Sequence, residues 1–295
     1  MRTNWKHSVL RSLGHQHYIP RGRDKVIRML HNPDTSPSIP FEVPFFGTVY
    51  FGNLNNFIDW SVFFYGAYAR HELYLLRDVA ATLRQTLSRP SSFYDIGANI
   101  GHHTLFMAPR VGRVFAFEPF EPVRRKLEEK IERNKLTNTT IFPLGLGDSD
   151  AELDFSEPSG ANQGTGSFVP AEGNRKVSRL QVRNGDHFFA SHELPSLDLV
   201  KMDVEGFEMR VLRGLRQRIL KDRPVILMEF FSQTKAEAGA EKEFREHLYE
   251  DARIFSVGDT SISSSYRLKP FSFALSDEIL VVPEEKVVDF EGVIF

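Results

Sequence analysis

The sequence contains no cysteine among its 295 residues, and it has no apolar run of about 18 residues that could cross a membrane. The first absence excludes disulfide bonds, thiolate metal sites and a cysteine nucleophile. The N-terminus also lacks the apolar segment of a secretory signal, so we expect a cytoplasmic protein. The formal net charge of only −2 gives no overall attraction to nucleic acid.

The chain contains enough apolar residues for a large hydrophobic core, with 41% hydrophobic residues and 26 Phe. From residue 93 onward, strand-like and helix-like segments alternate. We expect strands over 93–97, 113–119, 139–148, 197–206 and 224–231, and helices over 121–136, 207–220 and 236–250, with a closing strand pair at 253–258 and 278–283. This alternation predicts an α/β fold with a doubly wound, mostly parallel, Rossmann-like sheet.

The first 90 residues differ from the rest. Seven Lys or Arg side chains lie within the first 31 residues, against the single acid Asp24. This segment is either a solvated extension or a basic arm for an anionic membrane or an acidic substrate. Strand material follows at 41–52, and then helical material at 57–87 that breaks near Gly66. We therefore divide the sequence into residues 1–90, an extension and helical/β cap that could cover the substrate, and residues 91–295, the cofactor-binding domain.

The stretch "FYDIGANIGHHTLF" (93–106) has the order strand, glycine-rich turn, helix. In doubly wound sheets, ligands bind beyond the carboxyl ends of the strands, so this turn should contact a nucleotide. Gly97 and Gly101 allow a tight turn and a close ligand. Compared with the dinucleotide pattern G-x-G-x-x-G, however, Asn99 and His102 stand where glycine is needed. An NAD-binding oxidoreductase is therefore the less favoured alternative.

S-adenosylmethionine suits this turn better, because it has no phosphates. Asp95, at the strand end, could accept a hydrogen bond from its ammonium group. Glu118 ends the next strand and could accept from both ribose hydroxyls, while Asp148 ends the third and could accept from the adenine amino group. Three acids at successive strand ends are more specific evidence than "GANIG" alone.

These residues lie in stretches that resemble the FkbM family of S-adenosylmethionine-dependent methyltransferases. The resemblance rests on "FYDIGANIGHHT", "VFAFEPFEPVRRKLEEKIERN", "LGLGDSDAELDF", "LDLVKMDVEGFEMRVLRG", "PVILMEF" and "ILVVP", with a weaker echo at "YGAYARHELYLL". It implies a seven-stranded class I methyltransferase sheet with an antiparallel last strand. It also implies O-methylation of a small-molecule or glycan acceptor, on a saccharide or natural-product hydroxyl.

The candidate residues for the cofactor site are Asp95, Gly97, Asn99, Gly101, Thr104, Glu118, Pro119 and Asp148. Side-chain alternation along the fourth strand puts Lys201 and Asp203 on one face. We expect Asp203 to be the acid nearest the acceptor and Glu205 the second choice. Lys201 should be buried and paired with Asp203 or Glu229, as an orienting partner rather than a base. If a Mg²⁺ ion takes part, Asp203 and Glu229 are its candidate ligands.

Other roles stay open in the sequence. His102 or His103 could serve as a base, although both follow the cofactor turn. The aromatic run from Phe57 to Tyr68 could be a lid over the substrate or part of the core. Methylation of nucleic acid is disfavoured, because "DVEG" replaces the motif of base-N6 enzymes and C5 chemistry needs a cysteine. A non-catalytic module that keeps the fold is a further alternative.

Overall fold

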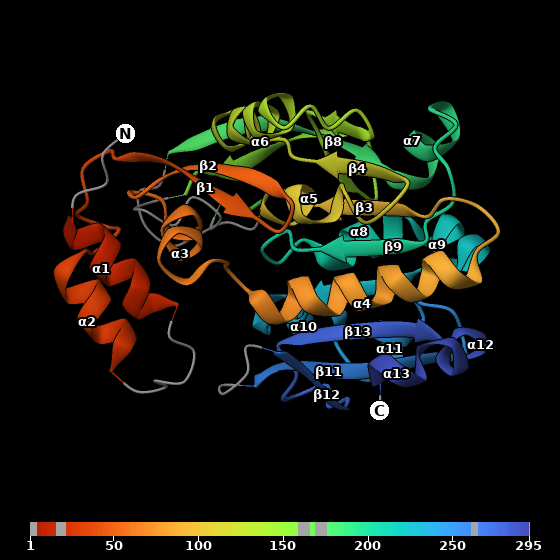
Figure 1. Cartoon of the computed structure of the whole chain (residues 1–295). Helices are drawn as coiled ribbons and strands as arrows, with labels where there is room; N and C mark the ends of the chain where they lie inside the picture. Colours follow the sequence, from red (N-terminus) through yellow and green to blue (C-terminus); the bar gives the residue numbers. More distant parts are fainter. Residues whose placement is uncertain (1–4, 16–21, 159–165, 169–175, 261–264, 295) are drawn as a thin grey trace.

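The structure is a computed structural model that describes residues 5–15, 22–158, 166–168, 176–260 and 265–294. At its centre lies an eight-stranded sheet with the order β12-β11-β13-β10-β9-β3-β4-β5 (Figure 1). The strands are β3 (Ser92–Ile96), β4 (Arg113–Phe117), β5 (Thr139–Phe142), β9 (Leu199–Met202), β10 (Val225–Glu229), β11 (Ala252–Thr260), β12 (Ser265–Pro270) and β13 (Glu278–Pro283).

The pairing within this sheet confirms the predicted doubly wound, mostly parallel architecture. Strands β5, β4, β3, β9 and β10 run parallel to one another, whereas β13 is antiparallel to both of its neighbours, β10 and β11. In chain order, the first strands of this sheet are β3, β4 and the edge strand β5, which lie side by side in that order. The next strand of the sheet, β9, lies on the other side of β3. This reversal is the switch point at which ligands bind in such sheets. The described sheet has one strand more than the expected seven, because β12 adds an antiparallel edge next to β11.

Both faces of the sheet are covered by helices, as the alternation of apolar residues requires. On one face, Phe93, Leu199 and Val225 pack with residues of α4 (Arg70–Thr86) and α5 (His102–Met107). On the other, Tyr94, Val200 and their neighbours pack under further helices. Those helices are α7 (Gly185–Ser191), α8 (Glu208–Gly214), α9 (Arg216–Asp222), α10 (Ser232–Ala238) and α11 (Glu241–Arg245). Helix α6 (Glu121–Arg133) packs Leu127 against Ala116 of β4.

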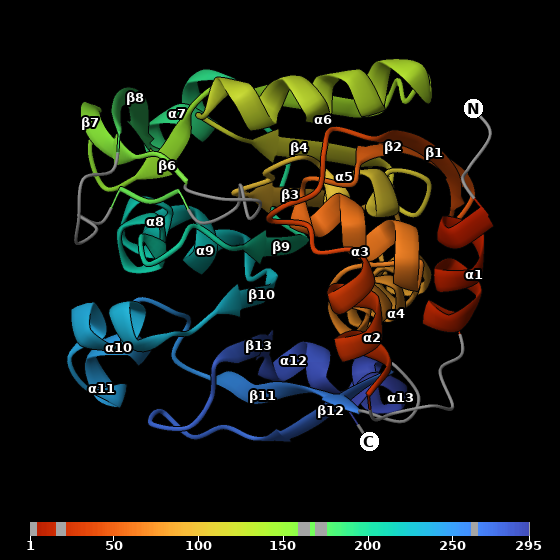
Figure 2. The same cartoon turned by 90° about the vertical axis from the view of Figure 1, so that its left-hand side faces the viewer.

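The first part of the chain forms small elements beside this sheet (Figure 2). They are α1 (Trp5–Gly14), α2 (Arg23–Leu30), the hairpin of β1 (Pro40–Phe45) and β2 (Thr48–Asn53), and α3 (Phe57–Tyr65). The predicted strand material and the break near Gly66, which has a φ of 85°, are confirmed. Phe45 and Trp60 belong to the same hydrophobic cluster as Phe93 and Leu199 of the sheet. The division of the sequence at residue 90 stays a prediction.

One predicted strand was wrong in extent. Residues 139–148 do not form a single strand, because Pro143 has no N–H to donate and the chain leaves the main sheet after β5. The continuation, β6 (Gly145–Gly147), pairs instead with β8 (Val177–Asn184), which also pairs with β7 (Ala151–Ser156). As a result, Asp148 lies beyond this small second sheet, where its Oδ2 is 3.4 Å from Nε of Arg213.

The predicted helices also differ in extent: 207–220 divides into α8 and α9, whereas at 236–250 the structure has the end of α10, which begins at Ser232, followed by the short α11. The chain ends in α12 (Glu284–Val287), the 3₁₀ turn η1 (Val288–Phe290) and α13 (Glu291–Ile294). Across the ranges that the structure describes, every helix is too short or too polar to cross a bilayer.

Candidate active site

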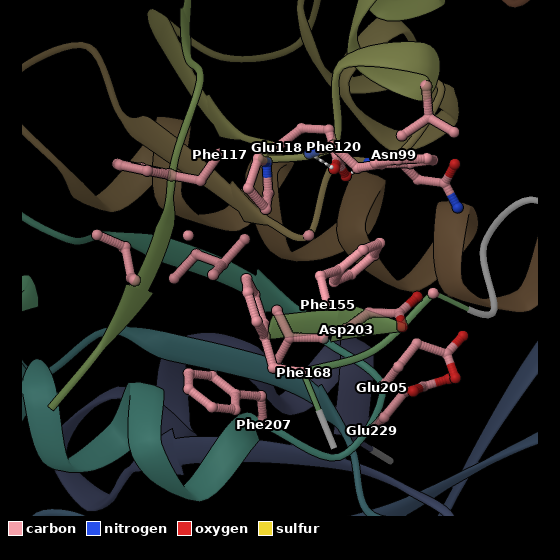
Figure 3. A pocket seen from close by; sticks show the side chains of 18 of the residues that line it. Asn99, Phe117, Glu118, Phe120, Phe155, Phe168, Asp203, Glu205, Phe207 and Glu229 are labelled. Carbon is pink, nitrogen blue, oxygen red and sulfur yellow. Dashed lines mark hydrogen bonds between the residues drawn. The ribbon is translucent and has the colours of Figure 1, made fainter. Parts of the chain in front are cut away.

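A pocket opens at the switch point, beyond the carboxyl ends of β3, β4, β9 and β10 (Figure 3). Five phenylalanines from different parts of the chain line its apolar wall: Phe117, Phe120, Phe155, Phe168 and Phe207. Four acids face it as well, namely Glu118, Asp203, Glu205 and Glu229. None of the described lining residues is Lys, Arg or His. The pocket thus combines an apolar wall with a concentration of carboxyl groups.

The turn between β3 and α5 forms the floor of this pocket, and its glycine and asparagine residues allow the backbone conformation that the turn requires. Gly97 has a φ of +84°, and a Cβ atom there would lie 1.9 Å from the backbone oxygen of Asp203. Gly101 also has a positive φ, but its missing Cβ makes room for Leu127 of α6, at 2.4 Å, rather than for a ligand. Asn99 faces the pocket with a φ of 51°, in the left-handed region that asparagine tolerates. Only one of the two glycines therefore borders the pocket.

Glu118 is held rigidly at the end of β4. Its Oε2 accepts a hydrogen bond from the backbone N–H of Asn99 and its Oε1 from that of Phe120, each at 2.8 Å. The side chain faces the pocket but is only 7% exposed. Burial raises the pKa of Glu118 to about 7, although both backbone donors act to lower it. Pro119 lines the same rim.

This raised pKa predicts how stability changes with pH in the cofactor-free protein. Between about pH 4.5 and 7, folded Glu118 keeps a proton that the unfolded chain releases, so the free energy of unfolding should fall as the pH rises. The expected loss is at most about 3 kcal/mol. Denaturant titrations from pH 4.5 to 8 should give a shallower slope for Glu118→Gln, whereas the exposed Glu250→Gln should keep the wild-type slope. Equal slopes for all three proteins would contradict the assignment.

Asp95 lies behind the turn rather than along the pocket. Its Oδ2 accepts a hydrogen bond from Thr104 Oγ1 at 2.6 Å, and the residue is 1% exposed. Within the described part of the chain, no group donates to its other oxygen. In the sheet register Asp95 stands opposite Lys201, whose charge acts to lower the pKa of Asp95, but burial dominates and raises it. The structure thus brings Asp95 and Thr104 together, one layer below the pocket.

Lys201, Asp203 and Glu229 form a buried charge system at the ends of β9 and β10. As side-chain alternation predicts, Lys201 and Asp203 share a face, and Nζ donates to Asp203 Oδ2 at 2.7 Å. Burial acts to raise the pKa of Asp203, but the Lys201 charge and hydrogen bonds from Lys201 and Glu229 bring it below its ordinary value. Burial and the neighbouring Asp203 raise the pKa of Glu229 to about 11. At neutral pH Glu229 therefore carries a proton, which it donates to ionised Asp203.

The turn after β9 presents Glu205 to the pocket (Figure 3). Glu205 and Gly206 both have positive φ, 53° and 94°. Glu208 stabilises this turn: its Oε1 accepts from the N–H groups of Val204 at 3.0 Å and of Gly206 at 3.2 Å. Thr234 of α10 donates to the other oxygen of Glu208 at 2.6 Å. The sequence analysis missed Glu208, although an acid at the end of "VEGFE", in the first turn of α8, is a recognisable signal for a helix-entry contact.

Tyr68 is a second pocket residue that the sequence analysis did not single out. It lines the pocket from the segment before α4, within the "YGAYARHELYLL" stretch. Burial raises its pKa, and the negative charges of Glu72, Asp203 and Glu229 add to that effect. Most of the aromatic run that includes Tyr68 is core instead, because Trp60, Phe63 and Phe64 are buried in the main cluster.

A further polar cluster lies behind these acids. His71, Glu72 and Glu278 bring their donor atoms within 4.8 Å of one another. Two of these groups are hydrogen-bonded to each other, with His71 Nε2 3.2 Å from Glu278 Oε2. His103 Nε2 lies 3.1 Å from Glu72 Oε2, without hydrogen-bond geometry. Burial lowers the pKa of His103 well below its ordinary value, which keeps the ring neutral. We interpret this cluster as a structural one that packs behind Asp203 and Glu229, rather than as a metal site.

His102 takes no part in the pocket. Its Nε2 lies 2.9 Å from the backbone oxygen of Tyr68, and its ring packs among Phe45, Tyr50 and Tyr68. Burial lowers its pKa well below the ordinary value. Neither His102 nor His103 lines the pocket.

Comparison of the sequence with known protein families identifies the family of this chain. The family model described as the methyltransferase FkbM domain matches residues 95–256, which is just over half of the chain. The chain belongs to the FkbM methyltransferase family. The matched range contains Asp95, Glu118 and Asp203, and it ends within β11.

Individual known proteins match this chain over part of their length. The hexuronic acid methyltransferase AglP of Haloferax volcanii is 33% identical over 141 residues, covering 47% of this chain and 56% of the relative. Methyltransferase 1 of Beauveria bassiana is 30% identical over 145 residues, covering 42% and 58%. The crystal structure of the methyltransferase FkbM from Methylobacillus flagellatus is 17% identical, with a TM-score of 0.44 over 69% of this chain and 47% of that one. The chain thus spans little more than half the length of these two curated relatives.

Proposed function

We propose that the protein transfers the methyl group of S-adenosylmethionine to a hydroxyl group of a saccharide or another small-molecule acceptor. The observation that carries this proposal is the acidic lining of the pocket: four carboxyl groups face it, Asp203 among them is ionised at neutral pH while Glu229 is protonated, and none of the described lining residues is basic. An acidic pocket attracts a sulfonium cation and repels the two phosphates of NAD. The oxidoreductase alternative is correspondingly weaker.

The two ends of the pocket suit the two ends of this cofactor. Glu118, fixed by two backbone N–H groups, is placed to accept hydrogen bonds from the ribose hydroxyls. The wall formed by Phe120, Phe155, Phe168 and Phe207 offers apolar surface for the adenine ring. Asp148 pairs with Arg213 instead, and Gly145 and Leu146 line that side of the pocket.

Asp203 is our candidate for the group that receives the acceptor proton. In the transfer, the acceptor oxygen attacks the methyl carbon, the carbon–sulfur bond breaks, and the hydroxyl proton passes to a carboxylate. Lys201 and protonated Glu229 keep Asp203 ionised and hold it in place. A carboxylate in this position also aligns the hydroxyl for in-line attack, and alignment alone contributes much of the rate. Glu205 is the second candidate.

The donor set at Asp203 and Glu229 does not fit a Mg²⁺ ion as it stands. One oxygen of Asp203 accepts from Lys201, and a hydrogen bond joins the two carboxyl groups. A divalent cation would have to displace both the shared proton and the ammonium group. We therefore assign no step to Mg²⁺ and propose that Lys201 provides the positive charge next to Asp203.

The proposal for the acceptor is supported by the relative described as a hexuronic acid methyltransferase. Sugars present several neutral hydroxyl groups, and Tyr68, Asp203 and Glu205 provide polar partners for them at the acidic end of the pocket. A uronic acid would bring its own negative charge, so we expect its carboxylate to point out of the pocket.

Calorimetric titration tests the cofactor directly. We expect S-adenosylhomocysteine to bind at micromolar concentration and NAD⁺ to show no binding, because only the dinucleotide brings phosphates to the acidic pocket. A positive result would justify a screen of neutral sugars and uronic acids for transfer of labelled methyl groups, with and without Mg²⁺. Binding of NAD⁺ in preference to S-adenosylhomocysteine would overturn the proposal.

A further inference from the structure

Exposed apolar side chains are concentrated on the first two helices. Ten large hydrophobic residues are exposed in the described chain, and five of them lie on α1 and α2, which together have 18 residues. They are Trp5, Val9, Val26, Met29 and Leu30, exposed by 39% to 79%. The other five are dispersed over separate elements between residues 177 and 288. Such a concentration on a surface usually marks a contact with a partner or a membrane.

These side chains are not the packing faces of the two helices. Helix α1 already buries Leu10 and Gly14, and a Cβ atom at Gly14 would lie 2.0 Å from the backbone oxygen of Phe64. Helix α2 buries Ile27, and just after it the backbone oxygen of His31 accepts from Trp60 Nε1 at 3.0 Å. Both helices are therefore fixed to the protein through one face, and their exposed apolar residues project from another.

The spacing of these residues puts them on common helix faces. Trp5 and Val9 are four residues apart on α1, and Val26, Met29 and Leu30 follow the i, i+3, i+4 pattern on α2. The two helices also contact each other. Each helix thus exposes a row of apolar side chains, here called an apolar stripe, and the two stripes belong to one pair of packed helices.

Positive charge surrounds the stripes. The first 31 residues contain seven Lys or Arg residues and one acid. Among the described ones, Lys6, Lys25 and Arg28 are exposed, while Arg11 and Arg23 are half-buried. Helices that combine exposed Trp, Met and Leu with basic side chains are typical of proteins that lie on anionic membrane surfaces.

The position of the two helices relates them to the pocket. In Figure 1, α1 and α2 stand on the side toward which the arrows of β4 and β9 point, and that is the edge at which the pocket opens. Figure 2, viewed from that side, shows α3 next to the ends of β3 and β9, with α2 and α1 farther out beyond α3. A surface that bound these two helices would therefore lie on the side of the molecule where the pocket opens.

We propose that α1 and α2 form a docking surface for an anionic lipid membrane. The charge argues against the other occupants. A second copy of the chain would bring two basic helix pairs together, and like charges at a contact oppose association. Nucleic acid would match the charge but not the apolar stripes, because phosphates offer no apolar surface. Anionic lipid matches both: its headgroups attract the cations, and its interface accepts Trp, Met and Leu side chains.

Vesicle sedimentation tests the surface independently of methyl transfer. We expect the protein to bind vesicles of phosphatidylcholine with about one third phosphatidylglycerol, to bind pure phosphatidylcholine vesicles at least about tenfold more weakly, and to lose affinity as salt rises. Met29→Ser/Leu30→Ser and, separately, Lys6→Gln/Lys25→Gln should each reduce binding to the anionic vesicles by about tenfold or more.

Two matched controls separate this surface from general effects. Leu275→Ser removes an equally exposed apolar residue elsewhere, and Lys242→Gln/Lys269→Gln removes two exposed cations elsewhere; both should bind as wild type does. All variants should keep the thermal stability and the S-adenosylhomocysteine affinity of the wild type. The proposal is overturned if anionic vesicles do not bind, if the controls lose as much affinity as the helix variants, or if Met29→Ser/Leu30→Ser abolishes a dimer in solution instead.

Discussion

Replacing Glu118 by alanine is expected to weaken the binding of S-adenosylhomocysteine by about a hundredfold or more. The wild-type carboxylate is fixed by the N–H groups of Asn99 and Phe120, so it is oriented before the ligand arrives. A hydrogen bond to a charged group contributes roughly 1.5–3 kcal/mol, and two ribose hydroxyls can each donate one. A loss of about 3 kcal/mol corresponds to about a hundredfold in affinity.

The alanine variant also leaves two backbone N–H groups without their acceptor, so its thermal stability has to be measured beside its affinity. Glu118→Gln keeps the size of the side chain and one oxygen, and we expect it to fold like the wild type and to bind between the two extremes. Glu121→Gln, on the exposed first turn of α6, is the matched control and should bind normally. Wild-type affinity in a folded Glu118→Ala protein would show that the ribose is held elsewhere.

The central part of this site was predictable because its determinants are local. Gly97 follows an apolar strand directly, and its positive φ is set by the turn itself. Lys201 and Asp203 are two residues apart on one strand, so the alternation of side chains is enough to put them on the same face. The hydrogen bond between them, at 2.7 Å, follows from that spacing and from burial of the strand.

The errors concern positions that depend on contacts far away in the sequence. Asp148 looked like a strand-end acid, but Pro143 turned the chain toward β8, a strand more than 30 residues later, and Arg213 became its neighbour. Gly101 looked like a ligand-facing glycine, whereas its space is taken by Leu127 of α6. Sequence patterns reveal that a glycine or an acid is needed, but not which of its neighbours requires it.

The same reason explains what was missed. Tyr68 reaches the pocket only because α4 packs across the sheet, and nothing in its own segment distinguishes it from the buried aromatic residues before it. Glu72 and Glu278 lie more than 200 residues apart, and they come together because Glu278 begins β13 opposite Glu229 of β10. An antiparallel strand inserted between two parallel ones brings its first residue to the edge where its neighbours end.

Replacing Asp203 by asparagine is expected to reduce the rate of methyl transfer by about a hundredfold to a thousandfold, while the affinity for S-adenosylhomocysteine changes by less than about threefold. Asparagine keeps an oxygen that can accept from Lys201 Nζ, but it removes the charge that balances the buried ammonium group, so the thermal stability of the variant has to be measured beside its activity. Asparagine also cannot take up the hydroxyl proton. Single-turnover transfer to an identified acceptor, together with calorimetry on the same preparation, measures both quantities.

Glu205→Gln is the matched variant, because Glu205 faces the same pocket from the adjoining turn. If Asp203 receives the proton, Glu205→Gln should lower the rate by less than about tenfold. The reverse pattern, with Asp203→Asn active and Glu205→Gln inactive, would assign the proton to Glu205. Asp203 would then be the residue that balances the charge of Lys201. Near-normal rates in both variants would mean that alignment of the acceptor hydroxyl suffices for transfer and that neither carboxylate acts as a base.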